Sequence, residues 1–394
     1  MFCQLEVLRH CLPSSVRFIL EELPESLDET YERILKEIRK PNQGHAHRLL
    51  QCLVAAVRPL RVEELAEVLA FDFNAEGIPK LNPGWRWENR EEAVMSACSS
   101  LAMIVKDGYS RVVQFSHFSV KEYLTASRLA EPIRDVSRYH IRLEAAHTIL
   151  AQACLGALLQ LDDQVDRDNI KNFPLARYAA QYWVTHARFE NASSRVKDGM
   201  ECLFDADKPH FAAWLWIYNE DQDGRSMSTM YPEKPGVVPL YYASMLGFRD
   251  LAEHLLTKHP EYVNARGGYE ETPMHSAARG GHADILSLLL ERGADMDAQW
   301  EGGSMTPLHR ASSYGKVEAV RFLLDRGADI NAQAAHWTAL HWAMSGRNIQ
   351  VVRLLLERGA DVNVRDGLGR TLSQLTTEQD VLALLSEYGA KSVK

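Results

Sequence analysis

The last third of the chain repeats one short pattern, and this repetition constrains the fold more than any other feature. The segment T-P-M-H-S-A beginning at Thr272 returns as T-P-L-H-R-A at Thr306 and as T-A-L-H-W-A at Thr338. A worn copy begins at Val238 and a degenerate one at Thr371. The copies begin about 33 residues apart, so each is one unit of an array whose outer units are atypical, as terminal repeats are.

Each unit predicts a pair of helices. The Thr hydroxyl can cap the first helix, and Pro273 or Pro307 fits its first turn, where no N–H bond is needed. Glycines suit the turn into the second helix and the end of that helix; they are Gly281, Gly315 and Gly346 for the turn, and Gly293, Gly327 and Gly359 for the end. No single pair can bury its apolar face, so the units must stack.

A period near 33 that opens with T-P-L-H-x-A closely resembles the ankyrin repeat. We predict about five such repeats over residues 236–394, forming a mainly α-helical solenoid. In an ankyrin stack the tips of the turns and the exposed face of the first helices line a concave groove. His275, His309 and His341 lie inside the motif, and we interpret them as buried, hydrogen-bonding residues rather than as catalytic ones.

Aromatic and arginine side chains gather where the groove is expected. Trp, Tyr and Arg are enriched at the residues that dominate binding energy in protein interfaces. The alternative is that one or two of these aromatic side chains only cover the neighbouring hairpin. We predict a protein-binding surface made of Tyr269, Arg279, Trp300, Arg310, Tyr314, His336, Trp337 and Trp342.

The part before the repeats is predicted as three segments. Residues 1–44 are expected to be helical, and residues 131–230 to form a helical connector. Between them, residues 45–130 combine three helical stretches with two short apolar runs that flank Asp107-Gly108, a strong hairpin signal. Three helices and a β-hairpin predict a small winged-helix-like α+β unit.

Three strings in this part resemble fungal NACHT–ankyrin proteins of the NLR-like STAND family. They are L-P-E-S-L-D-E-T-Y-E-R from Leu23, F-S-H-F-S-V-K-E-Y-L from Phe115, and P-L-A-R-Y-A-A-Q-Y-W-V-T-H-A from Pro174. In that family these strings follow the nucleotide-binding NACHT module, so residues 1–44 resemble the segment after a missing module. The sequence has no G-x-x-x-x-G-K-[ST] loop, and ATPase activity is therefore not carried over.

A winged helix raises the question of DNA binding. The candidate recognition helix and its approach carry Glu88, Arg90, Glu91 and Glu92, a charge pattern that does not suit phosphates. The formal net charge of −9 likewise argues against a general affinity for nucleic acid or anionic membranes. We therefore expect no direct contact with nucleic acid, and we interpret the unit as a structural spacer that also contacts neighbouring domains.

Cysteine usage and sequence motifs bear on compartment and chemistry. The six cysteines lie far apart with no C-x-x-C pair, which is typical of a reducing compartment. No secretory signal or long uncharged apolar run is found, so we expect a soluble protein of the cytoplasm or nucleus with no membrane partner. No G-x-S-x-G or H-E-x-x-H motif occurs. We expect no enzyme activity, cofactor, metal or small-molecule substrate.

These observations leave three hypotheses of function. The first is a non-catalytic sensor or adaptor of the fungal NACHT–ankyrin type that recognises a protein partner. The second is an ankyrin-repeat co-regulator of transcription in a fungal regulatory pathway. The third is a truncated fragment of a NACHT NTPase.

Overall fold

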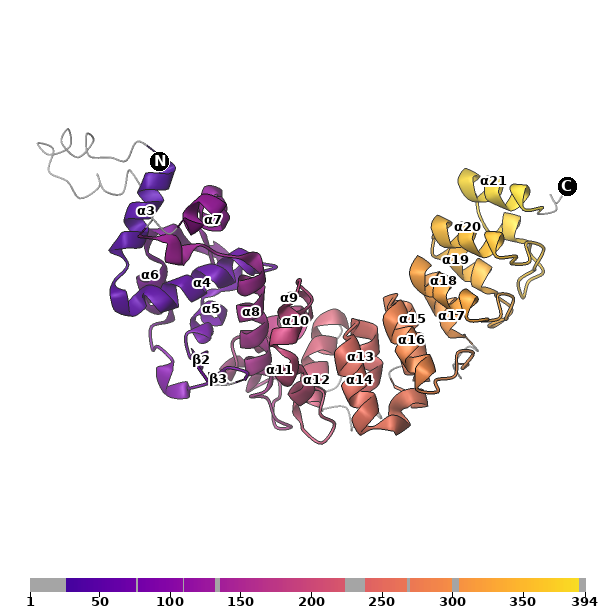
Figure 1. Ribbon diagram of the computed structural model, residues 1–394, viewed down its shortest axis with the longest axis horizontal. Coiled ribbons are helices and arrows are strands. Elements are labelled where there is room, and N and C mark those ends of the chain that lie inside the picture. Colours follow the sequence, from indigo (N-terminus) through magenta and orange to yellow (C-terminus); the bar gives the residue numbers. More distant parts are fainter. Residues whose placement is uncertain are drawn as a thin grey trace, which may run out of the picture. The chain divides into compact units, whose positions relative to one another are not determined.

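The computed structural model describes residues 26–75, 77–108, 110–131, 135–223, 238–267, 270–299 and 305–389. The chain forms two compact units, Met1–Tyr231 and Pro232–Lys394. Figure 1 shows mixed helices and strands in the first unit and helices in the second. Most of the helical segment expected over residues 1–44 lies outside the described residues, which begin within it with helix α3, Leu27–Glu37.

The first unit contains the predicted three helices and β-hairpin. The helices are α4 (Gln43–Ala55), α5 (Val62–Val68) and α6 (Arg90–Cys98), and the hairpin strands are β4 (Ala102–Asp107) and β5 (Ser110–Phe115). A third strand that the sequence reading missed, β1 (Leu60–Arg61), pairs antiparallel with β5 and gives the sheet order β1-β5-β4. Val113 lies opposite both Leu60 and Ile104, which places the apolar face of the sheet against the helices.

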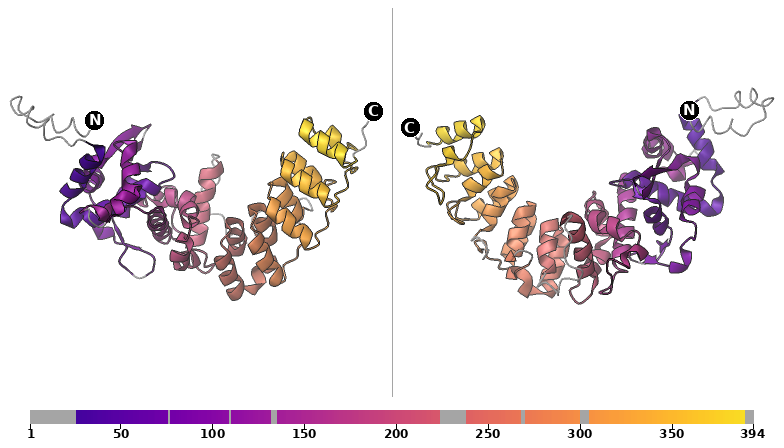
Figure 2. Two further views of the ribbon diagram at one scale, coloured as in Figure 1. Left: turned by 45° about the horizontal axis from the view of Figure 1, so that its top comes forward. Right: turned by 180° about the vertical axis from the view of Figure 1, so that it is seen from behind.

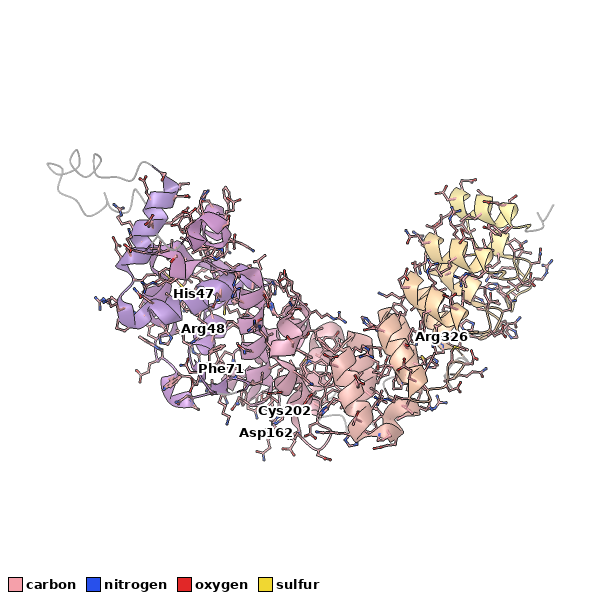
Figure 3. All side chains as sticks on the ribbon, in the orientation of Figure 1. His47, Arg48, Phe71, Asp162, Cys202 and Arg326 are labelled. Atoms are coloured by element: carbon pink, nitrogen blue, oxygen red, sulfur yellow. The ribbon has the colours of Figure 1, made fainter. Side chains whose placement is uncertain are left out.

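Further short elements complete this domain. Strands β2 (Phe71–Asp72) and β3 (Lys80–Leu81) form a small separate hairpin between α5 and α6. Phe71, labelled in Figure 3, is buried. The described residues of the first unit also form 3-10 helices, namely η2 (Lys40–Asn42), η3 (Pro83–Trp85), η4 (Ser99–Leu101), η5 (Ser127–Ala130), η6 (Ser137–Tyr139) and η7 (Ile170–Asn172).

The string F-S-H-F-S-V-K-E-Y-L builds the start of helix α7 (Phe118–Thr125) and its contact with α3. His117 is the N-cap residue, and its Nδ1 accepts from the N–H of Ser119 at 3.3 Å. The Ser119 hydroxyl bonds to His117 Nδ1 at 2.6 Å and to the Tyr31 hydroxyl of α3 at 2.7 Å. These bonds give the string a structural role, because they cap one helix and join it to another.

Five helices follow: α8 (Leu143–Leu158), α9 (Ala176–Ala187), α10 (Ala192–Arg195), α11 (Lys197–Leu203) and α12 (His210–Asp223). Helix α8 packs against both α4 and α9, so these helices extend the core of the first unit. Trp183 and Trp214 are fully buried, and their rings meet edge to face with centroids 5.7 Å apart. Phe204 completes the cluster.

A chain of polar groups centred on the buried Tyr178 and His186 joins α8, α9 and the segment that follows α4. The Tyr178 hydroxyl bonds to Nε2 of His186 at 2.9 Å, and Nδ1 of His186 bonds to Nδ1 of His147 at 2.9 Å. The N–H of Val57 donates to the Tyr178 oxygen at 3.3 Å. Burial, with His147 as a smaller cause, lowers the pKa of His186 to about 3, so this imidazole is neutral in the folded protein.

The second unit is an array of helical pairs, visible in succession in Figure 1 and from two further directions in Figure 2. The first helices are α13 (Pro239–Leu246), α15 (Pro273–Gly280), α17 (Pro307–Ser313) and α19 (Ala339–Ser345), and the second helices are α14 (Arg249–Lys258), α16 (Ala283–Glu291), α18 (Val317–Asp325) and α20 (Ile349–Glu357). First helices pack on first helices and second on second, which makes two layers. In the degenerate last copy a single 3-10 turn, η10 (Leu372–Gln374), replaces the first helix before α21 (Gln379–Glu387). A further 3-10 helix, η8 (Pro260–Asn264), follows α14.

The motif histidines are buried and hydrogen-bonded, as predicted. Nδ1 of His275 accepts from the N–H of Thr272 and bonds to its hydroxyl at 2.8 Å, and Nε2 bonds to the carbonyl of Met305 at 2.9 Å. His309 makes the same bonds to Thr306 and to the carbonyl of Ala332. A proton on Nε2 satisfies all of these groups, so His275 and His309 each brace their own helix start and the next repeat.

One turn between paired helices departs from the prediction. Gly281 and Gly315 have the expected left-handed φ values of 87° and 67°, but Gly346 has φ −77°. The following residue, Arg347, takes the left-handed conformation instead, with φ 54°. Gly346 remains necessary for a different reason, since a Cβ there would collide with the carbonyl oxygen of Ser313.

Asparagine side chains connect successive turns between repeats. Oδ1 of Asn264 accepts from the N–H of Asp295 at 2.9 Å, and its Nδ2 donates to the carbonyl of Gly293 at 3.2 Å. Asn331 accepts from the N–H of Asp361 at 2.9 Å in the same way. We refer to these contacts as the asparagine ladder. Each backbone group that bonds to one of these asparagines lies about one repeat further along the chain.

Candidate protein-binding surface

The first helices present one face to the layer of second helices and another outward. In α17 the burial of Leu308, His309 and Ala311 fixes the inward face, which leaves Arg310 and then Tyr314, just after the helix, on the other side. The same spacing places Arg279 and Trp342 on the outward face of α15 and α19. We call Arg279, Arg310, Tyr314, Trp337 and Trp342 the first-helix surface.

Arg310 is held by a buried carboxylate that the sequence reading did not single out. Its guanidinium forms an ion pair with Glu271, whose side chain has no exposed area, while the Arg310 side chain is 16% exposed. The Tyr241 hydroxyl donates to the other oxygen of Glu271 at 3.0 Å. This network links three successive repeats and explains why Tyr replaces His in the first motif. The sequence signal for this ion pair is a carboxylate directly before one motif together with an Arg directly after the histidine of the next motif.

Arg279 and Tyr314 form a pair on the neighbouring repeats. The guanidinium carbon of Arg279 lies 5.2 Å from the centre of the Tyr314 ring, within the range of a cation–π interaction. Tyr314 is 46% exposed, and Arg279 is half-buried. The pair offers a guanidinium and an aromatic ring side by side at the surface.

Two tryptophans form the other end of the first-helix surface. The rings of Trp337 and Trp342 lie 5.0 Å apart, and Trp337 also stacks on His341 at 5.8 Å. Trp337 closes a tight turn with Ala334, through hydrogen bonds of 2.8 and 2.9 Å. The two residues between them, Ala335 and His336, both have positive φ, of 49° and 68°. Two non-glycine residues in this conformation store strain, typically about 1 kcal/mol or more each.

The histidine beneath this tryptophan pair differs from its counterparts. His341 is buried and bonds to Thr338 through Nδ1, but its Nε2 has no hydrogen-bond partner among the described residues. The next turn has its own closure, in which Asp366 accepts from the N–H groups of Leu368 and Arg370. In the earlier repeats, Nε2 of the motif histidine bonds to the carbonyl of Met305 or Ala332. Among the described residues, no backbone carbonyl of the turn at Asp366 bonds to His341 in this way.

The predicted site residues fall into three sets. Arg279, Arg310 and Tyr314 lie on or directly after the adjacent helices α15 and α17, and His336, Trp337 and Trp342 lie in the next repeat, on α19 and the turn before it. Trp337 and Trp342 are half-buried and His336 is exposed. Tyr269 and Trp300 lie outside the described residues. Leu368, which is not among the predicted residues, is 78% exposed at the tip of the following turn.

The winged-helix unit has an exposed feature of its own. A cleft of about 660 Å³ lies at the start of α6, lined in part by Val62, Trp87 and Arg111. Trp87 is 51% exposed and Trp85 46% exposed. Helix α6 begins with Arg90, Glu91 and Glu92, and Arg111 pairs with Glu91. This local charge is unfavourable for contact with a phosphate backbone.

Models of known protein families match parts of both units. The family model described as ankyrin repeats matches in three copies, at residues 212–299, 240–334 and 300–366. The model described as the winged helix domain of GPI inositol-deacylase matches residues 31–132. The chain is therefore a mainly helical protein that combines a winged helix domain of this type with ankyrin repeats, and ankyrin repeats imply protein–protein interaction.

A curated relative extends the comparison. The chain is 33% identical over 279 residues to the "Azaphilone pigments biosynthesis cluster protein L" of Monascus ruber. The match covers 66% of this chain and 58% of the relative, so the chain spans little more than half the length of that protein. Within the described residues, no helix combines the length and apolarity that a bilayer crossing requires. No cluster of three or more His, Cys, Asp or Glu in that part is arranged to hold a metal ion.

Proposed function

We propose that this chain is a non-catalytic sensor or adaptor of the fungal NACHT–ankyrin type, which recognises a polypeptide partner through the first-helix surface. The main support is the grouping of Trp337 and Trp342 with the Arg279–Tyr314 pair on one layer of the repeats. Aromatic and arginine side chains with partial exposure are the residues that dominate binding energy at protein interfaces. The winged helix domain then serves as a spacer that contacts neighbouring domains.

Site-specific crosslinking in cells tests the location of binding. A photoreactive amino acid in place of Tyr314 should crosslink the chain to a defined protein partner. The matched control places the same group at Trp87, which is similarly exposed but lies in the other unit. Crosslinking to the same partner from Trp87 and not from Tyr314 would contradict the proposed surface.

The absence of catalysis is part of the proposal. The purified chain should hydrolyse ATP and GTP at the rate of the buffer alone. Hydrolysis above that rate, if it persists in variants of the first-helix surface, would contradict the proposal, because a sensor or adaptor of this kind does not hydrolyse nucleotides.

A second candidate function is favoured by the printed name of the relative. That name associates a similar fungal protein with a pigment biosynthesis cluster. On this reading the chain is an ankyrin-repeat co-regulator of transcription in a fungal pathway, acting through the same surface and without contact to DNA. Nuclear enrichment of the tagged protein, with changed cluster transcripts after its deletion, would favour this candidate. Unchanged transcripts would exclude it.

A further inference from the structure

Charged groups are divided unequally between the two layers of the repeat unit. The described first helices and η10 carry no carboxylate, and their only arginine or lysine side chains are Arg279 and Arg310. The second helices carry carboxylates throughout, namely Asp250, Glu253, Asp284, Glu291, Glu318, Asp325, Glu357, Asp380 and Glu387. Because Glu271, directly before α15, offsets Arg310, the first-helix surface has a net positive charge that comes from Arg279, in a chain whose net charge is −9.

The two arginines have different roles. Arg310 is mostly buried and is neutralised by Glu271, so it contributes little free charge. Arg279 contacts the aromatic side chains of Tyr314 and Tyr241, and the Glu271 carboxylate is a further electrostatic partner, but no ion pair joins Arg279 to a carboxylate among the described residues. Arg279 thus keeps a positive charge at the edge of this layer, beside the exposed Tyr314 ring.

Large apolar side chains lie beyond Arg279 along the array. The tryptophan pair follows the Arg279–Tyr314 pair along the array, and Leu368 is exposed on the turn after it. The turn tips approach each other here, because a Cβ on Gly367 would come within 3.1 Å of the His336 ring. A guanidinium that pairs with a carboxylate in two places adds directional specificity to the apolar contact.

We propose that the first-helix surface selects an acidic segment of its partner protein, in which one or more carboxylates precede or follow a large apolar side chain. A carboxylate pairs with Arg279, and the apolar side chain packs on Tyr314 and the tryptophan pair. This inference rests on the proposed function and narrows it to a class of partner. The charge of Arg279 would orient the bound segment, and the aromatic rings would supply most of the contact area.

Peptide display against the immobilised full chain tests the proposal. Selected sequences should be enriched in Asp and Glu next to Leu, Ile, Phe or Trp. A fluorescent peptide with the selected sequence should bind the unaltered chain and weaken at about 1 M salt, where charge interactions are screened within about 3 Å. Arg279→Glu should weaken its affinity by about tenfold or more, because an attraction becomes a repulsion.

Matched variants separate the two proposals. Arg321→Glu changes an equally charged residue of α18, 46% exposed in the second layer, and should leave affinity unchanged. Tyr314→Ala should lower affinity without unfolding the array, since its ring is nearly half exposed. Selection of neutral or basic peptides that still require Tyr314 would overturn the acidic preference and leave the proposed function standing. Selection of no peptide, or of peptides indifferent to Tyr314 and Arg279, would contradict both.

Discussion

The two units satisfy their buried polar groups in different ways. The first unit has a polar chain that occurs once and joins distant parts of the sequence, from Val57 through Tyr178 and His186 to His147. In the repeats, a local set of Thr, His and backbone carbonyl recurs from one unit to the next. The comparison teaches that repetition makes a polar contact readable from sequence, while a unique contact is visible only in three dimensions.

The Glu271 network is the exception inside the repeats, and breaking it should have the largest effect. Glu271→Ala leaves the buried Arg310 guanidinium and the Tyr241 hydroxyl without their partner. Removing one member of a buried ion pair typically costs about 3–5 kcal/mol. Chemical denaturation should show this loss in the free energy of unfolding. The control is Glu270→Ala at the adjacent exposed position, where the change should stay within about 0.5 kcal/mol; equal effects would contradict the network.

Acidification should weaken the first unit through His186. Its pKa is about 3 in the folded protein and near 6.5 in the unfolded chain, so the unfolded state binds the extra proton between these values. The free energy of unfolding should therefore fall as pH decreases below about 6.5, by about 1.4 kcal/mol per pH unit from this group. At about pH 5 the loss reaches about 2 kcal/mol.

The variant His186→Leu isolates this contribution. Its stability should be lower near neutral pH, because Tyr178 loses a partner, but its decline with acid should be shallower than that of the unaltered chain. Urea titrations at several pH values measure both slopes. Parallel slopes would show that His186 does not carry the proton linkage.

The motif histidines provide an internal comparison of smaller size. His309→Ala removes a bond from Nε2 to the Ala332 carbonyl, whereas His341→Ala removes an imidazole whose Nε2 has no described partner. We expect His309→Ala to cost about 1 kcal/mol more, the typical net value of one hydrogen bond. Thermal and urea unfolding of both variants provide the measurement. A larger cost at His341 would show that the unpaired nitrogen has a function in folding.

The smallest effect is expected at Arg347. This residue has a left-handed φ of 54°, and its ion pair with Glu378 is exposed. Arg347→Gly should stabilise the repeats by about 0.5 kcal/mol, because the relief of strain exceeds the loss of a surface ion pair. Gly346→Ala, one residue earlier, should destabilise them, since its Cβ would meet the Ser313 carbonyl. The unfolding midpoints of the two variants should move in opposite directions.

Much of the fold follows from local patterns in the sequence. The T-P-x-H spacing predicts the cap, the first helix and the buried histidine, because all three lie within one turn of the helix. The Asp107-Gly108 turn likewise predicts the β4–β5 hairpin. Strand β1 is only two residues long and forms through pairing with β5, a contact that no local pattern encodes.

The candidate site was predictable in part. Helical geometry places the residue after a motif histidine on the other side of the helix, so Arg310 and Trp342 could be placed on the surface layer, although Ser276 at the same position is buried. The pairing of Arg310 with Glu271 was missed, because the two residues lie in different repeats and only their places beside successive motifs connect them. The Trp337–Trp342 contact depends on the unusual turn at Ala335 and His336, whose left-handed backbone no residue type there demands.

The asparagine ladder has a consequence for how such an array can change. Asn264 and Asn331 each reach a backbone group about one unit further along the chain. The two bonds span 31 and 30 residues of chain, so a unit can differ by one residue between its ends and still form the same bond. Adding or removing a whole unit also leaves every such bond intact, and the surface that the protein offers can therefore lengthen or shorten by full repeats.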